Sequence, residues 1–221
     1  YLKVITFSHK DKKANVIYLD QKKNKKNYLM RFKINNIIKS FLISKELLNY
    51  KENILASLGI IINYFSIDRL NKNLFTNFNI PKSRGSIKKY NNGTKKLTII
   101  DESYNSNPLS FKFALEKFDN TYNEKNKKFL LIGDMLELGK YSRNLHIKIA
   151  KYINQSKVNK AFVYGKLVKH TFNKLKPQMK GKILKNKMDI LNLINKELPN
   201  NSFLMIKGSN STGLNKIIRY L

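Results

Sequence analysis

Polar and charged side chains follow three predicted strands in the last two thirds of the chain, at the points where the strands end. Three segments carry them: Asp101–Pro108 (DESYNSNP), Gly133–Gly139 (GDMLELG) and Lys207–Ser209 (KGS). A carboxylate such as Asp101 accepts hydrogen bonds from hydroxyl groups such as those of ribose, and Lys207 has the charge to bind phosphate or carboxylate. We therefore predict a ligand-binding rim, although the same residue types also turn loops and cap helices.

Two other kinds of site are excluded by spacing and composition. Gly133–Lys140 (GDMLELGK) is close to a P-loop, but it has five residues between its glycines instead of four and Tyr141 where Ser or Thr is needed. The carboxylates of Asp134 and Glu137 would also repel phosphates. The three histidines (His9, His146, His170) are too scattered to predict a metal cluster, and the chain has no cysteine. Neither a P-loop nor a metal site is therefore expected here.

The elements that must position the rim alternate regularly between strand and helix. The strands are predicted at Leu97–Ile100, Phe129–Ile132, Ala161–Tyr164, Lys182–Leu184 and Phe203–Ile206, and the helices at Pro108–Phe118, Ser142–Ile153, Lys166–Leu175, Met188–Leu198 and Leu214–Leu221. Leu109, Phe113, Leu115 and Phe118 are expected on the buried side of the first helix. Such alternation predicts right-handed βαβ units, and ligands bind at the carboxyl ends of such strands. Residues 82–221 are thus predicted to form one α/β domain with a Rossmann-like, mostly parallel sheet flanked by helices.

The first 80 residues have a different pattern. Strands are predicted at Leu2–Phe7, Ala14–Leu19 and Tyr28–Ile34, with the basic run Lys22–Lys26 as a solvated hairpin loop. An amphipathic helix is predicted over Lys51–Phe65, followed by a short helix from an N-cap at Ser66 through Phe75. Asn77–Gly85 has no periodicity and is predicted to be a domain boundary. Because the chain opens directly on a strand without Met, we expect it to be a fragment of a longer protein.

The net charge is high but of an uninformative kind. Lys and Arg number 44 against 14 Asp and Glu, which gives 44 − 14 = +30. Such a charge favours polyanion partners. However, 39 of the bases are Lys and only 5 are Arg, and there are 30 Asn. Specific nucleic-acid readers rely on Arg, whereas an A/T-rich genome enriches Lys and Asn together. We therefore expect no nucleic-acid partner, and a basic nucleic-acid-binding module is kept as a non-enzymatic alternative.

Composition also constrains the environment of the chain. Hydrophobic residues make up 42% of it and aromatics 11%, which predicts a folded protein. No apolar run approaches the roughly 18 residues of a membrane-spanning helix. Together with the absence of cysteine, this favours a cytoplasmic protein without membrane insertion. We also expect a monomer.

At the strand ends the sequence resembles the Mur ligase family, and within it the MurF type. Asp101–Pro108 is similar to the family's D-D-S-Y-N-A-N-P segment, and Gly133–Gly139 with His146 to its G-D-M-x-E-L-G and downstream histidine. Lys207–Ser209 resembles its K-G-S-R, with Asn210 in place of the arginine. Three motifs in this order are a specific signal.

Two weaker similarities extend the resemblance over the rest of the chain. Arg84 matches the arginine of the G-R pair that opens the family's C-terminal domain, with Ser83 in the Gly position, and Val4–Phe7 (VITF) is similar to a late strand of the central ATPase domain. The resemblance implies that residues 1–80 are the distal part of that ATPase domain and residues 82–221 the C-terminal domain.

The activity that the resemblance implies is an ATP-dependent amide ligation in peptidoglycan precursor synthesis. ATP and Mg²⁺ would activate UDP-MurNAc-tripeptide as an acyl phosphate, which the amine of D-alanyl-D-alanine then attacks. Asp101 would hold the ATP ribose, Arg84 the nucleotide or its phosphates, and Asn53 the adenine. The implied substrate-binding residues are Tyr104, Asn105, Asn107, Asp134, Glu137, Lys207 and Ser209.

This sequence departs from the family pattern in two places. The family's P-loop, acidic Mg²⁺ ligand and modified lysine would all precede Tyr1, so the catalytic residues are unknown here and the chain alone is predicted to be inactive. Asn49–Asn53 (NYKEN) keeps only the last residue of the family's adenine-contacting H-N-x-x-N. A ligase of the same superfamily with another acceptor, such as a folylpolyglutamate synthase, is the enzymatic alternative.

Overall fold

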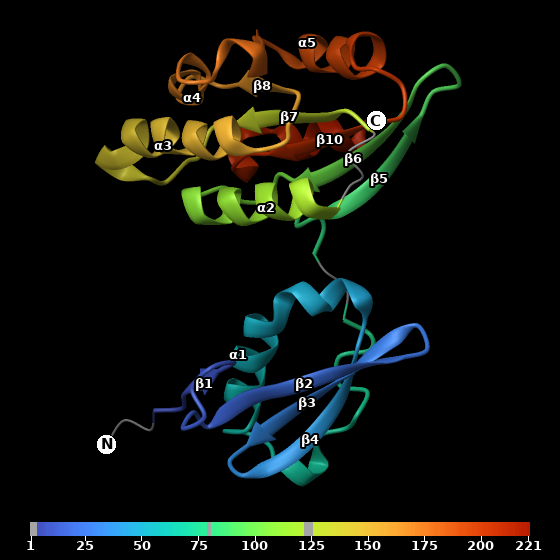
Figure 1. Ribbon diagram of the computed structural model, residues 1–221, viewed down its shortest axis with the longest axis vertical. Helices are drawn as coiled ribbons and strands as arrows, with labels where there is room; N and C mark the ends of the chain where they lie inside the picture. The colour runs from blue at the N-terminus through green and yellow to red at the C-terminus, as the bar shows by residue number, and fades with distance from the viewer. Residues whose placement is uncertain (1–3, 79–80, 122–125) are drawn as a thin grey trace. The chain divides into compact units, whose positions relative to one another are not determined.

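The computed structural model describes residues 4–78, 81–121 and 126–221, which belong to two compact units, Tyr1–Ile80 and Pro81–Leu221 (Figure 1). The division between the units, at Ile80 and Pro81, falls inside Asn77–Gly85, the segment predicted to be a domain boundary.

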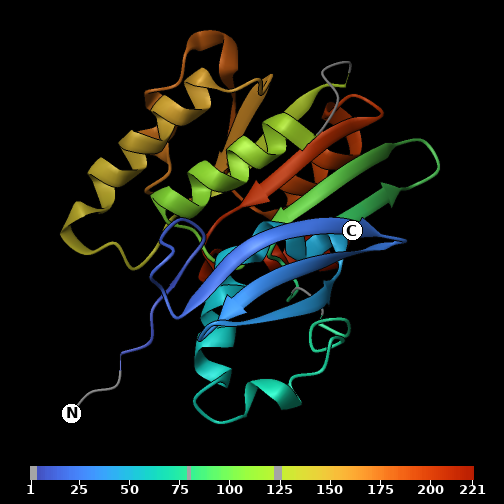
Figure 2. The same cartoon turned by 60° about the horizontal axis from the view of Figure 1, so that its bottom comes forward.

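The first unit is a small sheet with one helix against it. Its elements are β1 (Phe7–Ser8), β2 (Val16–Asn24), β3 (Asn27–Ile34), β4 (Ile37–Ile43), a 3₁₀ segment (Lys45–Tyr50), α1 (Lys51–Ile61) and a 3₁₀ turn (Ile67–Arg69). The strand order is β1-β2-β3-β4, with β1 parallel to β2 and the other pairs antiparallel. Phe32 and Phe41 on the sheet and Leu55 and Leu58 on α1 are fully buried in one core, so α1 covers one face of the sheet (Figure 2).

Several predictions for this unit are confirmed and others are wrong. The hairpin around the basic run is present, but its turn is only Lys25–Lys26. Lys22–Asn24, which were predicted to be loop, belong to β2 and pair with β3. β4 was not predicted. The helix predicted over Ser66–Phe75 is only the turn Ile67–Arg69, because Ser66 makes no side-chain cap and Leu70 is extended (ψ 114°).

Two other predicted elements are longer than the observed ones, the first strand at its start and the helix at its end. Of the predicted strand Leu2–Phe7, residues 1–3 lie outside the described residues and Val4–Thr6 are not in a strand. The long helix ends at Ile61, which leaves Phe65 60% exposed beyond it.

The second unit is a six-stranded sheet between two layers of helices. Its elements are β5 (Ser86–Asn91), β6 (Lys96–Glu102), α2 (Pro108–Thr121), β7 (Lys128–Gly133), α3 (Ser142–Gln155), β8 (Lys160–Tyr164), α4 (Lys169–Asn173), β9 (Lys180–Leu184), α5 (Lys187–Asn192) with a π-helical continuation (Leu193–Glu197), β10 (Ser202–Lys207) and α6 (Leu214–Arg219), with 3₁₀ turns at Gly139–Tyr141, Pro177–Met179 and Asn210–Thr212. The strand order is β5-β6-β10-β7-β8-β9, and all pairs are parallel except β5 with β6. The predicted α/β class with a mostly parallel sheet flanked by helices is confirmed.

Each face of this sheet has its own core. Phe111 and Phe118 of α2 and Ile149 of α3 pack on one face, and residues of α5 and α6 such as Ile190 and Ile217 pack on the other (Figure 1). The inner strands contain continuous apolar runs, such as Phe129–Ile132 of β7, because both faces are covered, whereas the edge strand β5 (SIKKYN) is mostly polar.

The predicted buried side of α2 is half wrong. Leu115 and Phe118 are buried, but Leu109 and Phe113 are 63% and 59% exposed. The buried stripe is Phe111, Ala114, Leu115 and Phe118, at the spacing of three and four that one face of a helix requires. Leu109 and Phe113 are four residues apart and share the opposite side.

Candidate functional site

The sheet brings three of the sequence segments to one edge. β10 lies between β6 and β7, with Lys207 paired to Glu102 on one side and to Ile132 on the other. Because these strands are parallel, their carboxyl ends meet, and with them the segments that follow: Asp101–Pro108, Gly133–Gly139 and Lys207–Ser209. We call this edge the carboxyl rim.

Asp101 is an internal structural acceptor. Its side chain is buried, its Oδ2 accepts a hydrogen bond from Ser83 Oγ at 2.8 Å, and its Oδ1 accepts bonds from the backbone N–H and the hydroxyl of Ser103. These bonds tie the segment that precedes β5 to the end of β6. Both carboxylate oxygens that were predicted to hold a ribose are already engaged within the protein.

Glu102, the next residue, is the carboxylate with the perturbed titration. Burial raises the pKa of Glu102 above its usual value, and the charges of Lys207, Lys117 and Arg84 oppose that rise, while Asp101 adds to it. Glu102 lies within the Asp101–Pro108 segment, but no role was predicted for it from the sequence. Glu102 could have been identified only from the pairing of β6 with β10, which places it directly opposite Lys207.

Lys207 is almost completely buried and holds the adjacent loop. Its Nζ donates a hydrogen bond to the backbone carbonyl of Asn105 at 2.9 Å. Burial lowers the pKa of Lys207, and the charge of Glu102 opposes this. The ammonium group therefore fixes the position of the 103–107 loop through this hydrogen bond, and Glu102 is the nearby opposite charge.

Replacing Lys207 with methionine should raise the pKa of Glu102 further. The positive charge of Lys207 is the largest of the influences that hold this pKa down, and methionine removes it at similar volume. Titration of the Glu102 carboxyl carbon by ¹³C NMR measures the change. Lys117→Met is the matched control and should give a smaller rise; an equal or larger rise in the control would contradict this order of influences.

The Gly133–Gly139 segment is held by hydrogen bonds to three other parts of the chain: His146, Ser209 and the turn after β8. Buried His146 on α3 accepts a hydrogen bond from the Met135 N–H at its Nε2 (3.0 Å) and donates one from Nδ1 to the carbonyl of Ser142 (2.7 Å). Because a carbonyl can only accept, this pair of bonds assigns a neutral imidazole with its proton on Nδ1. Burial lowers the pKa of His146, in agreement with that assignment.

Asp134 and Ser209 connect this segment to the next strands. The two Asp134 oxygens accept hydrogen bonds from the Val168 and Lys166 N–H groups at 2.7 and 3.1 Å, so its carboxylate closes the turn after β8. Ser209 donates its N–H to the Asp134 carbonyl and accepts from the Leu136 N–H at 2.9 Å. Both side chains, predicted to bind substrate, bind the protein's own backbone.

Of the other predicted substrate-binding residues, two asparagines bond to the backbone, while Glu137 and Tyr104 are exposed to solvent. Asn107 caps α2, with its Oδ1 accepting from the Ser110 N–H at 2.8 Å, and Asn105 Oδ1 accepts from the Ser106 N–H. Glu137 is exposed, with φ +63°. Tyr104 is 44% exposed, and the Arg84 guanidinium lies 4.3 Å from the centre of its ring, a cation–π contact.

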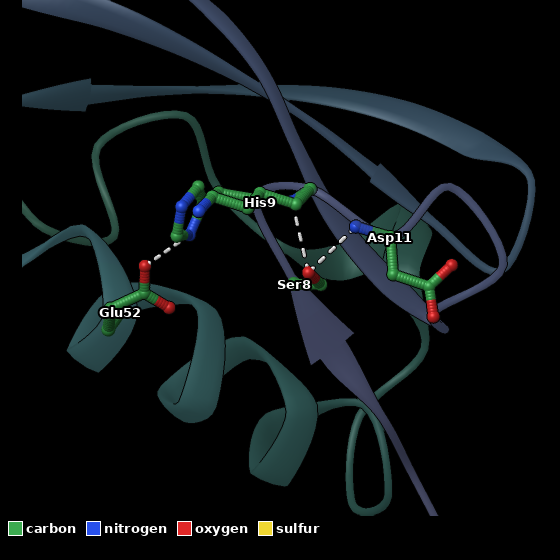
Figure 3. Close-up of polar contacts among 5 residues, drawn as sticks. Ser8, His9, Asp11 and Glu52 are labelled. Carbon is green, nitrogen blue, oxygen red and sulfur yellow. Dashed lines mark hydrogen bonds and ion pairs between the residues drawn. The ribbon is translucent and has the colours of Figure 1, made fainter.

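Asn53, the predicted adenine contact, belongs to the first unit. It is exposed on the first turn of α1, next to Glu52, whose carboxylate pairs with His9 Nδ1 at 2.5 Å (Figure 3). Ser8 Oγ accepts from the Asp11 N–H at 2.9 Å and so holds the turn that carries His9. The start of α1 is therefore tied to the segment after β1, which leaves Asn53 facing outward.

Among the described residues there is neither a cluster of metal ligands nor a membrane-spanning helix. Within 4–78, 81–121 and 126–221, no three His, Cys, Asp or Glu side chains gather closely enough to hold a metal ion. None of the described helices is long and apolar enough to cross a membrane.

Comparison with known proteins gives a consistent result. A family model described as "Mur ligase, glutamate ligase domain" matches residues 87–210, more than half of the chain. The chain is 30% identical over 141 residues to the UDP-N-acetylmuramoyl-tripeptide–D-alanyl-D-alanine ligase of Rickettsia prowazekii, covering 64% of this chain and 30% of that one. It is 30% identical over 128 residues to the Bacillus subtilis ligase of the same name, covering 57% and 28%.

Solved structures agree on the fold. The MurF ligase of Thermotoga maritima in complex with ADP matches with a TM-score of 0.69 at 15% identity, over 97% of this chain and 47% of that one. A MurF of Acinetobacter baumannii matches with a TM-score of 0.72 at 16% identity, over 98% and 46%. A folylpolyglutamate synthase of Mycobacterium tuberculosis matches with 0.64 at 9% identity, over 94% and 48%. The chain thus spans under a third of the curated relatives and under half of these structures.

Proposed function

The chain belongs to the Mur ligase family, and from that premise we propose that it is the distal part of an ATP-dependent ligase that joins D-alanyl-D-alanine to UDP-MurNAc-tripeptide. Residues 82–221 would be the C-terminal domain, and residues 1–80 the end of the central ATPase domain. ATP would supply the phosphoryl group that turns a poorly electrophilic carboxylate into an acyl phosphate. The reaction would take place in the cytoplasm.

The observation that carries the proposal is the assembly of the carboxyl rim. The three segments that resemble the MurF type meet at adjacent strand ends, and direct bonds join them: Lys207 to the Asn105 carbonyl, and Ser209 to Asp134 and Leu136. These bonds hold the three segments in a fixed arrangement, with the partly exposed ring of Tyr104 beside them in contact with the Arg84 guanidinium. Residues held in fixed positions can orient two reactants toward each other, as a ligation reaction requires.

The fold alone cannot identify the amine substrate that accepts the acyl group, because a folylpolyglutamate synthase has the same fold. The choice rests on sequence. The relatives that are 30% identical carry the D-alanyl-D-alanine ligase name, and the Tyr104-Asn105-x-Asn107-Pro108 run is of the MurF type. We therefore favour the dipeptide as acceptor over glutamate.

A domain exchange tests this proposal. Residues 81–221 would replace the matching C-terminal part of the Bacillus subtilis ligase, and phosphate release would be measured with ATP, Mg²⁺ and UDP-MurNAc-tripeptide. We expect release that requires D-alanyl-D-alanine and is not supported by glutamate. A folded chimera that uses only glutamate, or no acceptor, would overturn the proposal. If the chimera does not fold, calorimetric binding of D-alanyl-D-alanine to the 221-residue chain replaces it, and absence of binding at millimolar dipeptide counts against the proposal.

The 221-residue chain alone should not turn over. The described residues supply no cluster of carboxylates for Mg²⁺, and the sequence has no G-x-x-x-x-G-K-[ST] to grip the phosphates. With all substrates present, phosphate release should stay at the background of a matched sample without protein. Turnover above that background would refute the assignment of the phosphate-binding groups to an upstream segment.

A further inference from the structure

A cavity of about 500 Å³ opens at the carboxyl rim on the side of α6. Its walls come from the segment before β5, the loop after β6, and the turn and helix after β10. The lining residues are Pro81, Lys82, Ser83, Tyr104, Asn210, Ser211, Gly213, Asn215, Lys216 and Arg219. Lys82, Lys216 and Arg219 belong to none of the motifs that the sequence resemblance used.

The charges in this cavity all have the same sign. Lys82, Lys216 and Arg219 contribute three cationic groups, and none of the lining residues is a carboxylate. Arg84 is not a lining residue, but its guanidinium contacts the ring of Tyr104, which is one. This cavity differs from two other lysine-containing cavities, which include carboxylates among their lining residues although lysines outnumber them. The cavity around Tyr152 includes Glu116 and Asp119, and the cavity around Phe162 includes Glu197.

The uncharged wall of the cavity is polar and held in place. The side-chain amide of Asn215 donates to Asn210 Oδ1, which joins α6 to the turn after β10. Gly213 has φ +77°, and the space where a Cβ would stand is open. Ser83, at the back, is fixed by its bond to buried Asp101. The cationic side chains therefore surround a preformed polar floor rather than a mobile loop.

We propose that this cavity binds an oxyanionic group of one of the reactants, a phosphate or a carboxylate, through Lys82, Lys216 and Arg219. The inference rests on the proposed function, and it gives these three residues a role in binding a reactant at the α6 side of the rim. Arg219 can form two parallel hydrogen bonds to either kind of group, and the lysines act as point charges. Phosphate and carboxylate groups bind such side chains in the same way, so the experiment below uses a different probe for each of them.

The test measures saturable binding of two probes to the 221-residue chain by ¹H–¹⁵N NMR. ADP represents the phosphate source, and D-alanyl-D-alanine the carboxylate source. We expect one of them to shift the side-chain amides of Asn210 and Asn215 in a saturable way. Lys216→Gln/Arg219→Gln should weaken that binding roughly tenfold, the loss expected when charge-assisted hydrogen bonds are removed.

The matched control is Lys169→Gln/Lys174→Gln, which removes the same two positive charges from exposed positions on and next to α4. It should leave the affinity unchanged. Lys82→Gln, in the segment before β5, tests the same cavity without altering α6, and it should also weaken binding. Equal losses in both double variants, or no saturable shift with either probe, would overturn the cavity proposal. The domain exchange measures turnover independently, so the ligase proposal can survive that result.

Discussion

Alanine in place of Gly165 should destabilise the second unit by about 3–5 kcal/mol, from backbone strain together with a steric clash. Gly165 follows β8 with φ +138°, a conformation that residues with a Cβ rarely adopt, and a Cβ here would lie 2.4 Å from Asp134 Oδ1. The carboxylate cannot simply move away, because it accepts the Val168 and Lys166 N–H groups. Urea-induced unfolding followed by far-UV circular dichroism measures the change.

Gly139 provides a matched control for this substitution. It also has a positive φ (+54°), but nothing lies within 4 Å of the position of its Cβ. Gly139→Ala should therefore cost only about 1–2 kcal/mol, the strain of a left-handed conformation by itself. In the double variant Asp134→Ala/Gly165→Ala, the clash is absent, so the combined loss should be smaller than the sum of the single losses. A Gly165→Ala variant no less stable than Gly139→Ala would refute the clash.

His146→Ala should cost about 2–4 kcal/mol, since it removes a buried ring and leaves the Met135 N–H without its acceptor. Both ring nitrogens are bonded and the side chain is fully buried. His170→Ala is the control: this ring is only partly buried, and its loss should cost under about 1 kcal/mol. Chemical unfolding compares the two variants, and similar losses would contradict the structural role of His146.

The pH dependence gives a second test of the same residue. The pKa of His146 is lowered in the folded state, so its stabilising contribution is present above the unfolded value of about 6.5 and is lost as the pH falls through the folded value. The wild-type chain should therefore lose more stability than His146→Gln between pH 7.5 and pH 5. Glutamine can accept the Met135 N–H but does not titrate. Parallel pH profiles for the two proteins would show that His146 is not held neutral.

The sequence was a good guide to the helical and parallel part of the fold. Strands such as Phe129–Ile132 are apolar throughout because both faces are covered, and that pattern is legible without a structure. β4 and the antiparallel edge strand β5 were missed. β5 (SIKKYN) has one fully buried residue, Tyr90, so its apolar signal is weak, and it forms because β6 offers an edge to pair with.

The candidate site was found only in part. Position at strand ends identified Asp101, Asp134, Lys207 and Ser209, but it could not distinguish side chains that face a ligand from those that bind backbone. That difference depends on bonds to residues remote in sequence, such as Ser83 for Asp101 and Val168 for Asp134. Glu102, adjacent to Asp101, was passed over because its buried, cation-rich surroundings exist only after β10 has paired with β6. The predicted roles of the individual site residues stay predictions.

The central place of β10 has a consequence for how the molecule is made. β10 follows all the other strands of this sheet in the chain, yet it separates β6 from β7 and pairs with both along its length. Until residues 202–207 emerge, the nascent chain carries two unpaired strand edges with apolar faces, a state prone to association with other chains. The sheet and the carboxyl rim can therefore be completed only after all the other strands of the second unit have been synthesised, and a stop shortly before β10 would yield an aggregating product rather than a smaller folded domain.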